Sequence, residues 1–150
     1  MKDEGYMAFQ HDGRRKEGGI RTAVELWCTD PAAAKQQYGP IASWDTSEIT
    51  HMWRLFYNRA EFNGDISRWD VSSVTFMGAM LHGATSFNCD LSQWDVSNVT
   101  NMKWMLEGAT SFTHQLGGAW STSTASKFWM FHNCPGSIVG KTNNADGTPE

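Results

Sequence analysis

The chain of 150 residues contains no apolar run that approaches the roughly 20 residues a membrane-spanning helix needs, so we expect no transmembrane segment. Cysteine is scarce as well: Cys28, Cys89 and Cys134 are the three present, and none belongs to a Cys-x-x-Cys pair. An odd, widely spaced set argues against a disulfide framework. It predicts free thiols, with an intermolecular bridge through Cys89 or Cys134 as the alternative.

Charge of either sign is limited, with 12 Lys and Arg against 16 Asp and Glu for a net charge of −4. Such a mildly acidic surface argues against nucleic acid as the main partner. The first residues carry charge but lack the apolar core of a signal peptide. We therefore expect either a processed or trimmed form, or a protein that is not secreted by that route.

Sequence signatures of catalysis are missing. The five histidines have no metal-ligand spacing, and His132 lies too close to Cys134 in sequence to form a catalytic pair with an orienting third group. Neither a Gly-x-Ser-x-Gly elbow nor a phosphate-binding Gly-x-Gly-x-x-Gly loop occurs. These absences predict a non-catalytic protein without a cofactor or a dedicated metal site.

Internal repetition is the dominant feature of the chain. Residues 62–75 (FNGDISRWDVSSVT) and 87–100 (FNCDLSQWDVSNVT) are near-copies with a period of 25 residues. Trp44, Trp69 and Trp94 follow the same period. A fixed period between about 20 and 50 residues is typical of units that bury their apolar faces by stacking on one another. The repetition predicts a solenoid of four coils, at about 41–65, 66–90, 91–115 and 116–135.

The spacing of apolar residues within a copy predicts its local structure. Ile66, Trp69 and Val71 have the apolar-x-x-apolar-x-apolar pattern of the short strand in leucine-rich repeats. Val74 and Met77 continue at intervals of three, which favours a 3₁₀ or short helical return. The predicted fold class is therefore a leucine-rich-repeat-like solenoid of short parallel strands and helical returns, with an α-helical N-terminal cap. Its core would use the eight Trp, eight Phe and eight Met in place of leucine.

Residues 41 to about 131 resemble a known repeat family. The shared positions are the apolar frame, Trp-Asp, Ser, Val-Thr and Met, and the segment Thr22 to Ile41 resembles the one that opens such arrays. The family is the BspA-like leucine-rich repeats, in the branch with surface-protein repeats of 25–26 residues found in bacterial lipoproteins and plankton proteins. The resemblance implies a cell-surface or extracellular location and no assigned activity. One departure is Arg59, where the other copies have alanine.

The two ends of the chain differ from the repeats. Residues 1–19 are polar and aperiodic, which predicts an arm that is flexible or ordered by a partner. Residues 20–40 are predicted to form a helical cap, in which Asp30-Pro31 starts a helix that ends at Tyr38. Residues 136–150 are predicted to be a loose polar tail.

Strand alternation would place two rows of side chains on the exposed sheet face. Ser43, Arg68 and Gln93 form the row that varies between copies, and such positions are free to choose a partner. Asp45, Asp70 and Asp95 form the second row. The aspartates have two interpretations: they bind a hard cation such as Ca²⁺, or each accepts hydrogen bonds from backbone N–H groups a few residues further on.

A second candidate surface is predicted on the opposite side of the repeats. It consists of Tyr57, His82, Lys103, Trp104 and Glu107. Trp104 falls between two methionines of the frame and need not point inward, so it is a candidate anchor for a protein contact. Packing of Trp104 against the next coil is the alternative.

Three functions are consistent with these patterns. The first is a protein-interaction module that binds another protein, with a surface glycan as a further ligand. The second is a structural subunit whose terminal arms are ordered in a larger assembly, an organellar one included. The third is a cation- or glycan-binding protein that uses the aspartate row.

Overall fold

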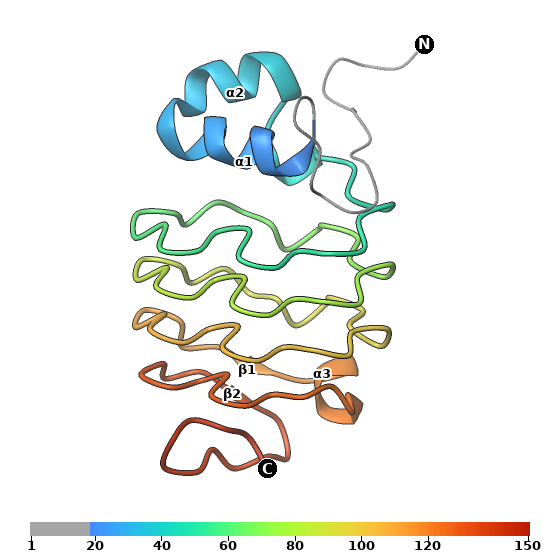
Figure 1. Cartoon of the computed structure of the whole chain (residues 1–150), viewed down its shortest axis with the longest axis vertical. Helices are drawn as coiled ribbons and strands as arrows, with labels where there is room; N and C mark the ends of the chain where they lie inside the picture. Colours follow the sequence, from blue (N-terminus) through green and yellow to red (C-terminus); the bar gives the residue numbers. More distant parts are fainter. Residues whose placement is uncertain (1–18) are drawn as a thin grey trace.

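The computed structural model describes residues 19–150, so the predicted arm at 1–19 lies almost entirely outside the described residues. Two helices, α1 (Ile20–Thr29) and α2 (Pro31–Tyr38), lie together at one end, and the rest of the chain follows in successive layers toward the C-terminus (Figure 1). None of the helices within residues 19–150 has the length and apolarity that a bilayer span requires.

Both helices have recognisable sequence determinants. The Asp30 side chain accepts a hydrogen bond from the N–H of Ala33, and Pro31 occupies the first turn, where its missing donor costs nothing. Gly39 ends α2 with φ +83°. The predicted helix ending at Tyr38 is therefore confirmed.

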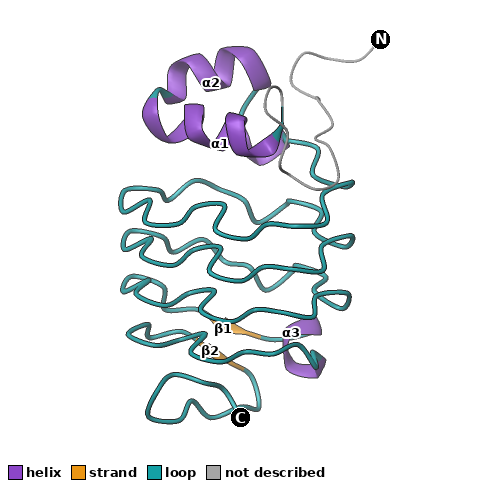
Figure 2. Ribbon diagram, in the orientation of Figure 1, coloured by secondary structure: helices purple, strands orange, loops and turns teal. Residues whose placement is uncertain are grey.

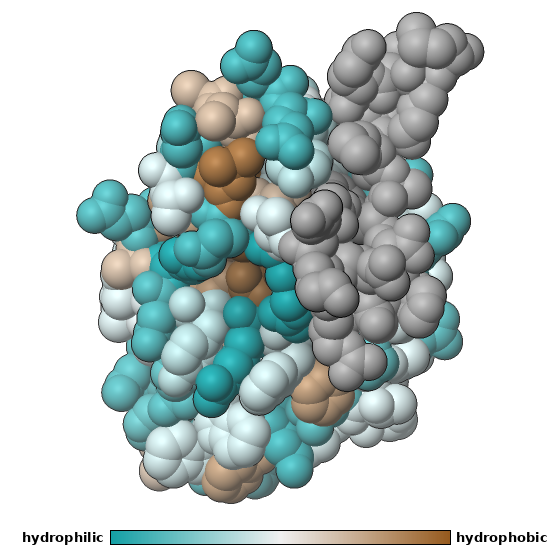
Figure 3. All heavy atoms as spheres, turned by 45° about the horizontal axis from the view of Figure 1, so that its top comes forward, coloured by the Kyte–Doolittle hydropathy of each residue, from teal (hydrophilic) through white to brown (hydrophobic). Residues whose placement is uncertain are grey.

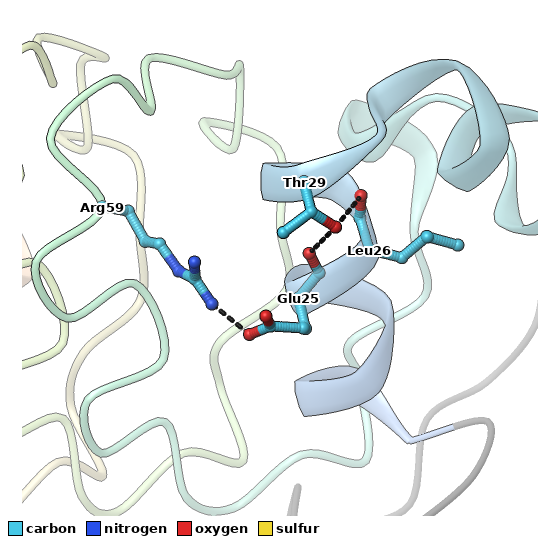
Figure 4. A network of polar contacts seen from close by, with 4 residues as sticks. All are labelled: Glu25, Leu26, Thr29 and Arg59. Atoms are coloured by element: carbon cyan, nitrogen blue, oxygen red, sulfur yellow. Dashed lines mark hydrogen bonds and ion pairs between the residues drawn. The ribbon is translucent and has the colours of Figure 1, made fainter.

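The helices pack onto the first layer through aromatic rings and one ion pair. Trp27 and Tyr38 each contact Trp44 edge-on, with ring centroids 5.8 Å apart. Arg59 reaches from the first layer to the carboxylate of Glu25 on α1 (Figure 4). At the equivalent position the later copies have buried alanines, so Arg59 is a local adaptation to the helix above it.

The predicted fold class is wrong. Turns and irregular segments dominate residues 41–150, as Figure 2 shows, and the segments predicted as strands, 66–71 and 91–96, contain none. The two strands described are β1 (Gln115–Leu116) and β2 (Ser137–Ile138), which pair in parallel as an open, two-stranded sheet. The remaining short elements are a 3₁₀ helix, η1 (Ile41–Ser43), and α3 (Ala119–Thr122). Neither a leucine-rich-repeat sheet nor helical returns are present in this part of the chain.

Tight turns produce the apolar spacing that suggested strands and returns. The N–H of Trp69 donates to the carbonyl of Ile66 at 3.2 Å, and the N–H of Val74 donates to Val71 at 2.9 Å. Met80 bonds to Met77 in the same way. In such an i to i+3 turn both end residues can face the core, which satisfies a three-residue apolar spacing without extended backbone.

Backbone hydrogen bonds join each layer to the next. The N–H of Met52 donates to Phe76, that of Met77 to Asn101 and that of Met102 to Ser126, at 2.8–2.9 Å. Isolated parallel bridges link the same segments: His51 to Phe76, Phe76 to Asn101 and Asn101 to Ser126. Single bridges between turns satisfy backbone groups without forming a regular strand, which explains why the layers align although little sheet exists.

Aromatic residues stack through the core between the layers. The ring centroids of Trp44 and Trp69 lie 6.1 Å apart, and those of Trp94 and Trp120 lie 6.5 Å apart. Each of these four indole N–H groups donates to a backbone carbonyl of a preceding segment. A buried indole needs such an acceptor, and these carbonyls supply it.

The expected loose tail at 136–150 is also a wrong prediction. The N–H of Phe131 donates to the carbonyl of Gly147 at 2.8 Å, and the N–H of Trp129 donates to the hydroxyl of Thr148 at 2.9 Å. In the earlier layers, the N–H groups at equivalent positions bond to the next layer. The tail therefore occupies the donor edge of the last layer, where unpaired backbone groups would otherwise face water or another chain.

Candidate binding surface

The residues of the first predicted row are not aligned on a sheet face. Ser43 ends η1 and donates its hydroxyl to the carbonyl of Pro40. Arg68 is exposed in a turn, and Gln93 and Asp95 line a hollow of about 520 Å³ together with Val139. The structure thus brings Gln93 and Asp95 together.

The aspartates form local turns with the serines two residues after them. Asp45, Asp70 and Asp95 each accept one bond from a serine N–H, at 3.0–3.1 Å, and one from its hydroxyl, at 2.6 Å. This confirms the interpretation of these residues as turn formers. Asp65 and Asp90 make the same pair of bonds, which the sequence analysis missed although the Asp-x-Ser pattern occurs twice in each of the near-copies 62–75 and 87–100.

These bonds lower the pKa of the carboxyl groups of Asp65, Asp90 and Asp95, with the bond from the serine hydroxyl as the largest cause. The stability they contribute is fully present above the ordinary pKa of 3.8 and is lost as pH falls through the lower folded value. We expect the free energy of unfolding, measured by urea titration, to fall once the pH drops below about 3.8.

The matched control for this pH dependence replaces the three partner serines, Ser67, Ser92 and Ser97, by alanine. Without the hydroxyl donors, the folded pKa values move toward the ordinary value, so the variant is expected to lose less stability on acidification. An equal loss in the variant and the parent would contradict a role for the Asp-Ser turns in acid sensitivity.

Most of the large apolar side chains are buried, and hydrophobic residues form only small, separate patches on the face in Figure 3. Four large apolar residues of the described chain are exposed: Trp53 (44%), Trp104 (39%), Phe128 (45%) and Val139 (45%). Trp104 and Phe128 are in edge-on contact, with ring centroids 6.2 Å apart. Trp53 and Trp104 line a common hollow of about 280 Å³, which we call the aromatic hollow.

The other residues of the aromatic hollow are Arg54, Tyr57, Ala79, His82 and Glu107. The Arg54 guanidinium lies 4.3 Å from the ring centroid of Tyr57 and 4.7 Å from that of Trp53, so it interacts with both π faces. His82 stacks on Tyr57 and its Nδ1 lies 3.1 Å from the Glu107 carboxylate. These contacts hold the rim in place.

Four of the five residues predicted for the second surface therefore meet in this hollow; Lys103 is not among its lining residues. Sequence reasoning missed Trp53, Arg54 and Ala79. The 25-residue repeat could have identified two of them. Trp53 lies 50 residues before Lys103, and Arg54 lies 50 residues before Trp104, so each occupies the same repeat position as a predicted residue.

A third hollow, of about 480 Å³, lies where α1 meets the first layer and is lined by residues that include Trp27, Cys28 and Arg59. Burial raises the pKa of the Cys28 thiol, as it does for Cys89, and raises that of Cys134 to about 11. Thiolate is the reactive form, so these thiols are poor nucleophiles at neutral pH. Over residues 19–150, His, Cys, Asp and Glu form no group of three that fits a metal ion.

Neither the curated proteins nor the solved structures contain a match to this chain. A protein family described as "Mycoplasma protein of unknown function, DUF285" matches residues 30–139, which include α2, the aromatic hollow and β2. Because this match covers well over half of the chain, the protein belongs to the DUF285 family.

Proposed function

We propose that this chain is a non-catalytic protein-binding module. Its contact surface is the aromatic face, defined as the aromatic hollow together with Phe128. The observation that carries the proposal is the exposure of Trp53, Trp104 and Phe128, at 39–45%, on one continuous surface. Exposed apolar clusters of this kind mark interaction sites, and tryptophan is among the residues that contribute most to binding energy.

The tryptophans of the core provide an internal comparison. Trp69 and Trp94 are almost fully buried, and their indole N–H groups bond to backbone carbonyls. Trp53 and Trp104 are neither buried nor hydrogen-bonded through their indole nitrogens within the described residues. Trp104 packs edge-on against Phe128, yet 39% of Trp104 and 44% of Trp53 stay exposed, and this exposed part is available to a partner.

The sequence of residues 41 to about 131 resembles BspA-like surface-protein repeats, and this resemblance supports a binding role outside the cell. The resemblance is limited to the sequence, because these residues fold mainly as turns and do not form a leucine-rich-repeat sheet.

The test is quantitative affinity capture from the native source. We expect a specific partner protein to be retained by the parent chain and reduced about tenfold or more by the double variant Trp53→Ser, Trp104→Ser, which removes two anchors. The matched control is Gln93→Ala, Asp95→Ala in the hollow near Val139, which should retain the partner.

Two results would contradict the proposal. Loss of the partner in the control but not in the tryptophan variant would place binding at Gln93 and Asp95 instead. Co-migration of the chain as a stoichiometric part of a large complex, unchanged by the tryptophan variant, would favour a structural subunit. Thermal melts of both variants establish that each is folded before capture.

A further inference from the structure

The aromatic hollow exists because one position in a row of equivalent residues carries a small side chain. Arg54, Ala79, Trp104 and Trp129 are spaced 25 residues apart, and all have a left-handed backbone with φ of 54–58°. This conformation is unusual for residues other than glycine. Ala79 is the small member, so a gap opens beside it between the large side chains of the neighbouring layers.

Gly78 contacts one of the indoles but does not itself line the hollow. A Cβ atom at Gly78 would lie 3.2 Å from Cδ1 of Trp53, so the glycine allows this indole to pack closely. Ala79 is the small apolar residue of the lining, together with the indoles of Trp53 and Trp104. A small apolar residue between aromatic rings suits a narrow segment with flat, rigid apolar groups.

The hydrogen-bonding groups of the hollow restrict the type of ligand. The N–H of Arg54 bonds to Gly78 and that of Ala79 bonds to Lys103, so a partner strand cannot add to the backbone here. His82 is paired with Glu107. The indole N–H groups of Trp53 and Trp104 have no acceptor within the described residues and are donors available to a ligand.

The lining of the hollow has one basic residue without an acidic partner among residues 19–150. Glu107 is the acidic residue of the lining, and its carboxylate lies 3.1 Å from Nδ1 of His82. Arg54 also lines the hollow and makes no ion pair with a described residue. Its guanidinium is therefore available to an acidic group of a ligand.

From these features we infer that the aromatic hollow binds an extended proline-rich segment, carrying acidic residues, of a partner protein. This inference rests on the proposed function and specifies its partner. A polyproline II segment has no internal hydrogen bonds, so its carbonyls can accept bonds from the two indole N–H groups. Its proline rings pack against aromatic side chains in grooves, and its acidic residues can pair with Arg54.

The probe is a synthetic oligoproline peptide with glutamates at both ends, titrated into ¹⁵N-labelled protein. We expect the indole N–H resonances of Trp53 and Trp104 to move, while those of the buried indoles stay in place. The variants Trp53→Phe and Trp104→Phe assign the two resonances. Higher salt should weaken binding because the charge complementarity is exposed to solvent.

The decisive variant is Ala79→Trp, which fills the hollow with the side chain found at the equivalent positions 104 and 129. Because the left-handed backbone already accepts tryptophan there, we expect the variant to fold and to bind the peptide about tenfold more weakly or worse. Ala79→Arg, which copies Arg54, is the second blocking variant if the first does not fold. Gln93→Trp is the control for an added surface tryptophan and should bind normally.

Each remaining outcome would overturn the inference. If a glycine-serine peptide with the same glutamates moves both resonances as much as the oligoproline does, the binding depends on charge and not on proline. A cello-oligosaccharide that moves them, where the peptide does not, would make the ligand a glycan. If Ala79→Trp binds as the parent does, the hollow is not the site. If the oligoproline has no effect although the tryptophan variant loses its native partner, the protein-binding function stands and this inference fails.

Discussion

Replacement of Trp69 by alanine is expected to lower the free energy of unfolding by about 3–5 kcal/mol, as for other large-to-small changes in a packed core. Trp69 is 3% exposed, stacks on Trp44 and tilts against Phe56. Its indole N–H donates to the carbonyl of Ile41 at 2.8 Å. The change would therefore open a cavity between two layers and remove one of the two hydrogen bonds to the carbonyl of Ile41, which also accepts from the N–H of Trp44 at 3.3 Å.

Equilibrium urea unfolding measures this effect, with Trp53→Ala as the matched control. Trp53 is 44% exposed and makes no indole hydrogen bond in the described structure, so its loss should cost no more than about 1 kcal/mol. Trp69→Phe keeps one aromatic ring but removes the N–H donor and part of the buried ring volume, for an expected loss of about 1–3 kcal/mol. A loss below about 1 kcal/mol for Trp69→Ala would be incompatible with a core role for this residue.

The second large effect is expected at Gly147, in the segment that covers the last layer. Its φ is +83°, and a Cβ there would lie 2.3 Å from the backbone nitrogen of His132 and 2.5 Å from its Cα. Gly147→Ala would combine backbone strain with a clash that only backbone movement relieves. We expect a loss of about 2–5 kcal/mol, the sum of the strain and overpacking costs.

Gly140 is a close control, because its φ is also +83° and no atom lies within 4 Å of the Cβ that alanine would add. Gly140→Ala should cost only the backbone strain, about 1–2 kcal/mol. The difference between the two variants measures the contact of residues 143–150 with the last layer. Equal losses would indicate that this segment does not depend on the close approach at Gly147.

The sequence predicted which residues are buried better than it predicted the backbone that buries them. Ile66, Trp69 and Val71 are buried as the spacing required. The apolar spacing fits both a strand and a pair of tight turns. The Asp-x-Ser segments favour the turns, because the aspartate side chains provide local hydrogen-bond acceptors that compete with a sheet. The first three copies carry this signal, and the fourth, at 116–135, lacks it.

The tail was mispredicted for a different reason. Residues 136–150 are polar and aperiodic, and such a composition is typical of disorder. What orders them is the edge of the last layer, which needs acceptors for the N–H groups of Trp129 and Phe131. These unpaired N–H groups exist only in the folded protein, so the composition of residues 136–150 does not reveal that the segment pairs with them.

The candidate site was predictable in part. Tyr57, His82, Trp104 and Glu107 were grouped from the repeat register, and they line one hollow. The hollow itself depends on the small side chain of Ala79, which is 5% exposed, and on the left-handed backbone at this position. Neither property can be read from residue type alone, because alanine is equally typical of a buried position that borders no hollow.

The row of left-handed positions accepts side chains of very different size. Arginine, alanine and tryptophan occupy the same backbone geometry at positions 54, 79, 104 and 129, while the buried frame around them keeps its apolar character. Arg54 and Trp104 are exposed, so a replacement at either would change the outer surface and leave the packing of the frame in place. The proposed contact surface and the interior can therefore vary independently at these two positions.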